Sequence, residues 1–273
     1  MTTKITPAAH LAEVQASFDE SMNPRLVEIL RSAVRHLHAF VEETGMTREE
    51  WKAGIDFLTK TGQKCDDVRQ EFILLSDTLG VSMLVEMINQ RPSDNATDPT
   101  VFGPFYVPGA PEKVMGDSIA SPGGGGEPLV IRGAVRNASG APLGRARLDV
   151  WQVAPNGLYD VQDPDMAPMS YRGVFTTGAD GRFEIHTSRP VDYQIPTDGP
   201  VGQLLQATGR HSWRPAHTHF MVTCPGYKTL ITHVFDRASP NLASDAVFGV
   251  RDSLIIDMDN GSASIDFVLD TEQ

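Results

Sequence analysis

The spacing of apolar residues near the start of the chain predicts amphipathic helices. From Asn23-Pro24 to Thr44, apolar positions recur at steps of three and four residues, which is the period of one helix face. Asparagine is a favoured cap and proline a favoured first helical residue, so the start of this helix is well marked. The segment Thr47-Arg48-Glu49-Glu50 has the form of a capping box and predicts a second helix that runs to about Thr61.

Two further apolar runs extend the helical part of the chain. One lies after Cys65 and the other covers residues 81–88, and each predicts one more helix. The first 20 residues are weakly patterned, and we expect them to be loose. We therefore predict a helical domain at residues 1–95.

The apolar pattern changes to that of β-strands after a stretch rich in proline and glycine. Short apolar runs then alternate with turn residues, and no helical period intervenes. The predicted strands cover residues 129–135, 146–150, 173–176, 183–186, 218–223, 229–235 and 254–258. Several short strands in succession are typical of a β-sandwich. The sequence thus predicts an α+β protein in which a sandwich at residues 96–273 follows the helical domain.

Composition and charge restrict what such a protein binds. Lys and Arg number 23 against 35 Asp and Glu, a net charge of −12, which argues against a nucleic acid or an anionic membrane as the partner. The sequence shows no apolar run long enough to span a bilayer and no signal-peptide pattern at its start. The two cysteines, Cys65 and Cys224, are far apart and suggest free thiols in a reducing compartment. We expect a cytoplasmic protein without membrane insertion.

Candidate metal ligands gather in the segment from Gly209 to Phe220, which holds three histidines and two arginines in twelve residues. Its end alternates like a strand, so His217 and His219, two residues apart, project from the same face. Two imidazoles on one face make part of a metal site if further ligands arrive from elsewhere. The alternative is a polar edge strand that holds no metal.

Two loop tyrosines are candidates for the missing ligands. Tyr159 ends the segment Asn156-Gly157-Leu158-Tyr159, and Tyr193 lies in the middle of the segment 190–196. A phenolate suits a hard, strongly Lewis-acidic ion that keeps it deprotonated despite a free pKa of about 10. Zinc or copper would favour further histidine or cysteine, so ferric iron fits these side chains best. Other candidate ligands in this half are Tyr171, Tyr227, His186, His211 and His233.

These residues also carry a resemblance to a known family. The chain is similar to the intradiol ring-cleavage dioxygenases in the segments 156–159, 190–196, 209–220 and 97–105. The resemblance spans about residues 23–267. Within the family, Leu74-Leu75-Ser76-Asp77 and the segment 245–250 look most like those of hydroxyquinol 1,2-dioxygenases.

The resemblance implies one Fe(III) per subunit, bound by Tyr159, Tyr193, His217 and His219. It implies that O2 cleaves an aromatic ring between two adjacent hydroxylated carbons, so that hydroxyquinol (benzene-1,2,4-triol) gives 3-hydroxy-cis,cis-muconate or maleylacetate. Tyr193 would leave the metal and take up a substrate proton. Arg214 would stabilise negative charge that develops on the ring; its alternative role is a structural ion pair.

The same resemblance implies a substrate pocket. Its lining residues would be Leu74, Asp77, Val101, Phe102, Gly103, Phe105, Ile195, Pro196, Arg214 and Val247. Asp77 can accept a hydrogen bond from a third ring hydroxyl and therefore favours hydroxyquinol over catechol; its alternative role is to cap the helix near Thr78-Leu79-Gly80. His233 stands where catechol-cleaving relatives have glutamine, and we interpret it as a catalytic residue that donates to a substrate or dioxygen oxygen. Its alternative is a strand histidine bonded to the backbone.

Other readings and partners stay open at this point. Catechol or chlorocatechol is an alternative substrate, and a transthyretin-like binding module without chemistry is the non-enzyme alternative. The resemblance implies a homodimer formed through the N-terminal helices, in some relatives with a phospholipid in the interface. The amphipathic 24–44 helix suits such an interface, but packing of its apolar stripe on the sandwich of its own chain explains it equally well.

Overall fold

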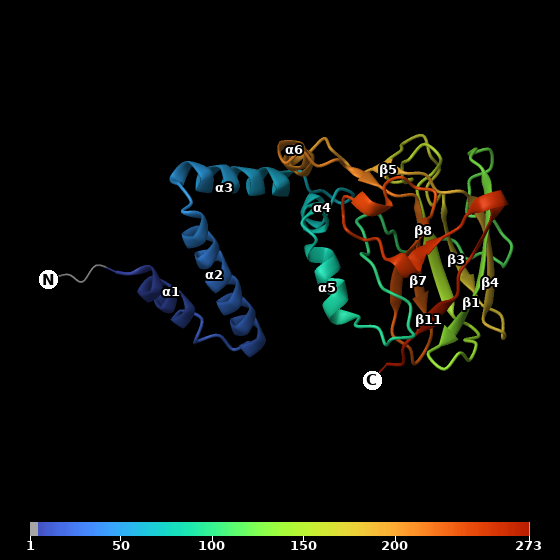
Figure 1. Ribbon diagram of the computed structural model, residues 1–273, viewed down its shortest axis with the longest axis horizontal. Coiled ribbons are helices and arrows are strands. Elements are labelled where there is room, and N and C mark those ends of the chain that lie inside the picture. Colours follow the sequence, from blue (N-terminus) through green and yellow to red (C-terminus); the bar gives the residue numbers. More distant parts are fainter. Residues whose placement is uncertain (1–4, 273) are drawn as a thin grey trace. The chain divides into compact units, whose positions relative to one another are not determined.

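The structure is a computed structural model that describes residues 5–272. Within these residues, five helices come first along the chain and a part rich in strands follows, which confirms the predicted α+β architecture (Figure 1). The chain forms two compact units, one that ends at Thr59 and one that begins at Lys60. Among the described residues, none of the helices is both long and apolar enough to cross a membrane.

The first third of the described chain forms five helices, and two of them, α2 Pro24–Thr44 and α3 Arg48–Gln63, begin where the sequence places their caps. The other three are α1 Pro7–Ala16, α4 Glu71–Thr78 and α5 Val81–Asn89. The side chain of Asn23 accepts the backbone N–H of Leu26 and so caps α2. The capping box of α3 is closed in both directions, because Thr47 accepts from the Glu50 amide and Glu50 accepts from the Thr47 amide.

The expectation of a loose start is wrong for α1. The hydroxyl of Thr6 accepts the N–H of Ala9, and Pro7 occupies the first helical position, so this helix has a local cap that a weak apolar pattern does not reveal. The side chain of Gln15 also donates to the backbone carbonyl of Arg31 in α2. Residues 1–4 lie outside the described part.

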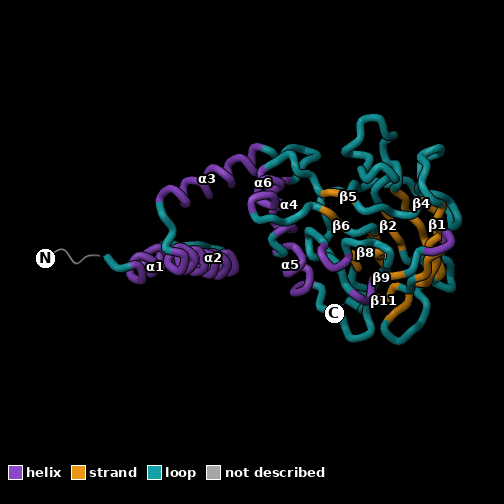
Figure 2. The backbone as a smooth tube through the Cα atoms, turned by 45° about the horizontal axis from the view of Figure 1, so that its top comes forward, coloured by secondary structure: helices purple, strands orange, loops and turns teal. Residues whose placement is uncertain are grey.

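The strands form two main sheets and one short ribbon (Figure 2). One sheet has the order β3-β2-β7-β8-β9; in the other, β1 pairs with β4 on one side and with β10 and β11 on the other. The strands are β1 Pro128–Asn137, β2 Arg147–Trp151, β3 Arg172–Thr176, β4 Arg182–Ser188, β5 Tyr193–Gln194, β6 Trp213–Arg214, β7 His217–Thr223, β8 Leu230–Asp236, β9 Ile255–Ile256, β10 Ser262–Ser264 and β11 Phe267–Leu269. All seven predicted strands are present, whereas β5, β6, β10 and β11 were not predicted.

The main apolar core lies between the two sheets. It takes Ile131 from β1 and Ile185 from β4, and it takes Val150, Phe220 and Val234 from the facing sheet. Because strand residues alternate in direction, the neighbours of the last three point away from this core. Those outward positions include Trp151, His219 and His233, so the candidate ligands lie on the outer face of the five-stranded sheet.

The expectation that no helix interrupts the strands is wrong at α6 Pro200–Ala207. Its start is fixed by a residue far away in the sequence, since the buried carboxylate of Glu71 in α4 accepts the N–H of Val201. An acidic group suits a helix N-terminus, where amides are free and the helix dipole is positive. Sequence pattern alone does not show this cap.

Candidate metal centre

A row of three aromatic side chains crosses the outer face of the five-stranded sheet. Trp151 on β2 and His233 on β8 are both register partners of His219 on β7. The Trp151 ring stacks on the His219 ring with centroids 4.7 Å apart, and the His233 ring packs edge-on at 4.1 Å. The imidazole of His219 is therefore held between two rings of neighbouring strands.

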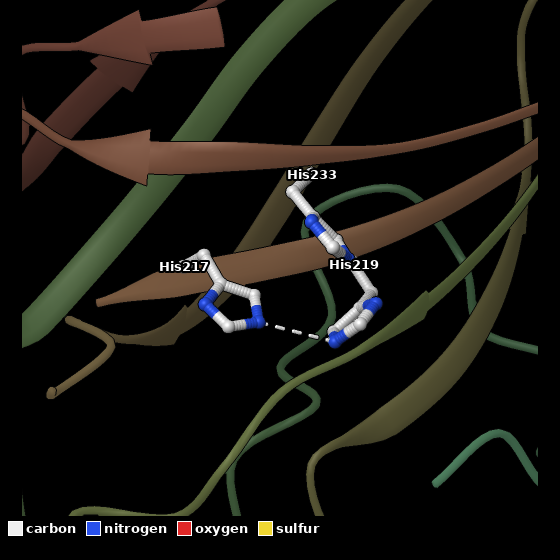
Figure 3. A group of neighbouring side chains, drawn as sticks. All are labelled: His217, His219 and His233. Atoms are coloured by element: carbon white, nitrogen blue, oxygen red, sulfur yellow. Dashed lines mark hydrogen bonds between the residues drawn. The ribbon is translucent and has the colours of Figure 1, made fainter. Parts of the chain in front are cut away.

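His217 and His219 project from the same face, as their spacing predicts (Figure 3). Their Nε2 atoms are 3.2 Å apart. His217 Nδ1 lies 2.7 Å from the carbonyl oxygen of Pro215, so Nδ1 carries the proton and Nε2 keeps a free lone pair. His219 Nδ1 is buried without a partner among the described residues, so stacking on Trp151 fixes its ring instead.

Tyr159 reaches the histidines from the loop after β2. Gly157 adopts the left-handed conformation, φ +80°, that this tight turn needs, and the turn carries the tyrosine over the sheet. The ring of Phe105 stacks on Tyr159 with centroids 4.6 Å apart. The Tyr159 hydroxyl lies 3.0 Å from His219 Nε2 and 3.4 Å from the Tyr193 hydroxyl.

Tyr193 and Arg214 are register partners in the β5–β6 ribbon. Arg214 Nη1 donates to the Tyr193 hydroxyl at 3.2 Å and lies 3.2 Å from His217 Nε2. Both side chains are buried. The ribbon therefore brings a cation and a phenol together beside the histidine pair.

The four donor atoms fit a single metal ion. Neighbouring donors of Tyr159, Tyr193, His217 and His219 lie 3.0 to 3.4 Å apart. Ligand atoms at about 2.0 to 2.1 Å from one ion lie about 3 Å from one another, as edges of its coordination polyhedron. Two imidazole nitrogens and two phenol oxygens thus form a donor set that a metal ion can occupy.

Burial determines the charge state of these side chains when no metal is bound. Desolvation, reinforced by the nearby Arg214 charge, lowers the pKa of His217 to about 3. Desolvation likewise holds the pKa of His219 well below its usual range, and with Tyr193 it raises the pKa of Tyr159 well above its usual range. The histidines are therefore neutral ligands at pH 7, while a tyrosinate here needs a cation beside it.

His233 is fully buried, and neither of its ring nitrogens has a hydrogen-bond partner among the described residues. The structure therefore does not show the backbone-bonded histidine that was the alternative. One ring nitrogen of His233 lies within 4.8 Å of one ring nitrogen of His217 and one of His219. Burial, followed by the neighbouring His219, lowers its pKa well below the usual range, so this ring is neutral.

Some predicted pocket residues contact the candidate ligands or the ring beside them. Phe105 stacks on Tyr159, Gly103 lies against the His219 ring, and the Phe102 ring lies 5.9 Å from that of Trp151, which stacks on His219. Asp77 on α4 is buried, which raises its pKa. The charge of Arg214 acts to lower this pKa and that of Asp245 acts to raise it. Pocket positions for the remaining residues stay predictions, namely Leu74, Val101, Ile195, Pro196 and Val247.

Asp245 is a site residue that the sequence did not single out. Its carboxylate accepts from Arg214 Nε at 3.1 Å and from Nη2 at 3.3 Å. Although burial works in the opposite direction, Arg214 holds the pKa of Asp245 below its usual range, so the pair is ionised. The two residues are 31 positions apart, and no local spacing rule joins them.

Other candidate ligands lie apart from the four donors. His186 pairs with Glu184 on β4, and His211 Nδ1 accepts the N–H of Trp213. Tyr227 packs against the main core, and the Tyr171 hydroxyl lies beside Gly124 of the glycine-rich loop. They are not among the residues that converge on His217 and His219.

Comparison with known families gives this arrangement a class. Residues 23–97 match the family model described as catechol dioxygenase N terminus, and residues 101–271 match the one described as dioxygenase. The chain belongs to the intradiol ring-cleavage dioxygenases, which are oxidoreductases, as the sequence resemblance indicates.

Individual relatives cover nearly the whole chain. A 6-chlorohydroxyquinol 1,2-dioxygenase of Cupriavidus pinatubonensis is 51% identical over 93% of each chain. A hydroxyquinol 1,2-dioxygenase of a Rhizobium species is 50% identical over 86% of this chain and 80% of its own. The solved structure of hydroxyquinol 1,2-dioxygenase from Pseudomonas putida superposes with a TM-score of 0.90 at 49% identity, covering 97% of this chain and 99% of that one.

Proposed function

We propose that this protein is a non-haem Fe(III) dioxygenase that cleaves hydroxyquinol between its adjacent hydroxylated carbons. The products would be 3-hydroxy-cis,cis-muconate and its tautomer maleylacetate. The observation that carries the proposal is the convergence of the Tyr159, Tyr193, His217 and His219 donor atoms in a buried site. The substrate names of relatives about half identical over most of the chain support it.

Ferric iron suits the donor set better than the common alternatives. Phenolate is a hard anionic ligand, and burial makes Tyr159 costly to ionise unless a strongly charged ion lies beside it. When bound, Fe(III) would supply a Lewis-acidic centre that takes the substrate as a catecholate and makes its ring reactive towards O2. The identity of the metal and its charge are part of the proposal.

The chain's own residues then have separate roles. Tyr193 would take up a substrate proton at its phenol oxygen, and Arg214 Nη1, which already donates to that oxygen, would hold it in place. The guanidinium, fixed in a dry site, stabilises negative charge that develops on the substrate. Neutral His233, with both nitrogens free of protein partners, offers one N–H to a substrate or dioxygen oxygen.

Asp77 supports hydroxyquinol over catechol. Its carboxyl group is buried on α4 within the field of Arg214, where a third ring hydroxyl gives it a partner that catechol lacks. The role of helix cap has no support from its contacts, because the carboxyl group hydrogen-bonds to the Ser82 side chain, and at the helix end the Gly80 N–H donates to the Asp77 backbone carbonyl instead.

The remaining proposals concern the assembly of the protein and its domain organisation. A homodimer through the N-terminal helices is supported by the exposed apolar side chains of α2, of which Leu37 is 61% exposed. A domain boundary near residues 95 and 96 is supported by the family matches that meet between 97 and 101, although the compact units divide at Thr59. The interface phospholipid and the cytoplasmic location stay predictions.

The test is the visible spectrum of the purified protein before and after anaerobic addition of hydroxyquinol or catechol. We expect a phenolate-to-Fe(III) band that moves to longer wavelength with substrate, and faster consumption of hydroxyquinol when air is admitted. A colourless protein without iron would overturn the metal assignment. A coloured protein that prefers catechol would overturn only the substrate.

A further inference from the structure

The strongest unassigned feature near the site is the carboxylate of Asp245. Both of its oxygens are used twice. Oδ1 accepts from Arg214 Nε and from the amide of Val247 at 3.3 Å, and Oδ2 accepts from Arg214 Nη2 and from the amide of Gly249 at 3.0 Å. One buried carboxylate thus binds the guanidinium fork and the backbone of the 245–249 loop together.

We propose that Asp245 is the positioning residue that aims the Arg214 guanidinium at the metal-ligand oxygen of Tyr193 and couples it to the loop that carries Val247. The catalytic role of Arg214 in this inference rests on the proposed function. Because Nε and Nη2 are taken by Asp245, Nη1 is the nitrogen left to face the Tyr193 hydroxyl and His217 Nε2, each at 3.2 Å. A planar guanidinium held on one edge presents its other edge in a fixed direction.

Packing around the pair leaves little freedom. A Cβ atom on Gly249 would lie 3.2 Å from both Arg214 Nη2 and Asp245 Oδ2, and 3.7 Å from His233 Nδ1. Gly249 therefore allows the loop to close onto the ion pair and brings it next to His233. Its φ is not in the left-handed region, so alanine is permitted by the backbone and acts as a purely steric probe.

The loop contact extends the role of Asp245 to the substrate pocket. Val247 is a predicted pocket residue, and its amide is bound to the same oxygen that holds Arg214 Nε. A shift of the carboxylate therefore displaces the catalytic cation and one wall residue together. Substitution of Asp245 should change turnover more than substrate affinity, since a displacement of about 1 Å near reacting atoms costs about 100-fold in rate.

The test compares Asp245→Asn with Gly249→Ala and with Asp236→Asn as a matched control. Asp236 is also buried and also binds an arginine fork, accepting from Arg189 Nε at 2.6 Å and Nη2 at 3.2 Å. The control therefore reports the general cost of neutralising such a pair. Each full-length variant is assayed for kcat, KM and the visible band, and the solvent exchange of the Arg214 Nε–H is followed by NMR in the metal-free chain.

We expect Asp245→Asn to lower kcat about 100-fold with a smaller change in KM, and to speed the exchange of the Arg214 Nε–H at least about tenfold. Gly249→Ala should lower kcat about three- to tenfold with the charge intact, which keeps the inference testable if Asp245→Asn does not fold. Exchange and kcat equal to those of Asp236→Asn would overturn the positioning role. If the parent protein neither binds iron nor cleaves a ring, the proposed function fails, and the NMR comparison still decides whether Asp245 holds Arg214.

Discussion

The compact unit that begins at Lys60, which we call the strand unit, buries ionisable side chains, whereas the N-terminal helices expose large apolar ones. His217, His219 and His233 are nearly inaccessible to solvent in the strand unit. In contrast, none of the residues of α2 is buried, and Phe40 is 50% exposed. Each region departs from the ordinary rule that polar groups are solvated and apolar groups covered.

The difference indicates what each region binds. Buried polar groups are stable only with partners, and under the proposed function an ion and a substrate would supply them to the unpartnered nitrogens and crowded donor atoms. An exposed apolar stripe is satisfied by another apolar surface, which the proposed dimer provides. Changes in one region should therefore affect metal chemistry, and changes in the other should affect assembly.

The largest effect is expected from loss of a metal ligand. His219→Ala or Tyr159→Phe should weaken metal binding by more than about 100-fold. Even mutation of a residue that only hydrogen-bonds to a metal ligand lowers metal affinity about 10- to 100-fold. Metal analysis after gel filtration and the visible spectrum measure this. His186→Ala is the matched control, because His186 pairs with Glu184 on the opposite sheet. Full metal retention in His219→Ala would contradict the donor set.

Acid should destabilise the metal-free protein through the same buried histidines. Their pKa values are lower in the folded state than the usual 6.5, and that of His217 is about 3. At a pH between the folded and the unfolded pKa, the unfolded chain therefore binds more protons than the folded chain. Stability is therefore full above about pH 6.5 and falls as pH drops towards 3, by up to about 1.4 kcal/mol per pH unit for each histidine.

Urea unfolding at a series of pH values measures this slope. His233→Gln should reduce it by about one proton, because it removes one of the three depressed groups. His186→Ala should leave it unchanged. An identical slope in His233→Gln and the parent protein would show that His233 is already charged or exposed when the chain is folded.

A charge on the exposed face of α2 should weaken the dimer without changing the metal chemistry. Leu37→Asp or Phe40→Asp should raise the dimer dissociation constant by at least about tenfold, because burial of such a side chain contributes about 1.5 to 3 kcal/mol. Sedimentation equilibrium measures the change. His36→Asp adds the same acid at an exposed polar position of this helix. Equal behaviour of all three variants would remove the apolar face from the interface.

The smallest effect is expected from the specificity residue. Asp77→Ala should lower kcat/KM for hydroxyquinol about tenfold more than for catechol, since it removes a hydrogen bond to the third hydroxyl, worth about 1.5 kcal/mol. Steady-state assays with both substrates measure the ratio, and Asp77→Asn, which keeps a hydrogen-bonding oxygen, should lose less. An equal loss for both substrates would leave Asp77 without a role in selection.

Local signals in the sequence predict the elements well where they are strong. The cap at Asn23, the capping box at Thr47 and the alternating apolar runs give α2, α3 and the seven main strands. Weak or distant signals fail: α1 has little apolar contrast, and the cap of α6 comes from Glu71, 130 residues away from Val201. The short strands β5 and β6 depend on pairing with each other, which no single segment reveals.

The sequence by itself determined which side chains are available for metal chemistry and that His217 and His219 share a face, because strand alternation is a local property. Only the tertiary structure decided that Tyr159 from a loop and Tyr193 from β5 lie beside those histidines, that His233 lies there without a partner, and that Asp245 holds Arg214. These contacts depend on sheet register and loop closure between segments far apart in the chain. They are therefore set by the packing of the whole compact unit that begins at Lys60.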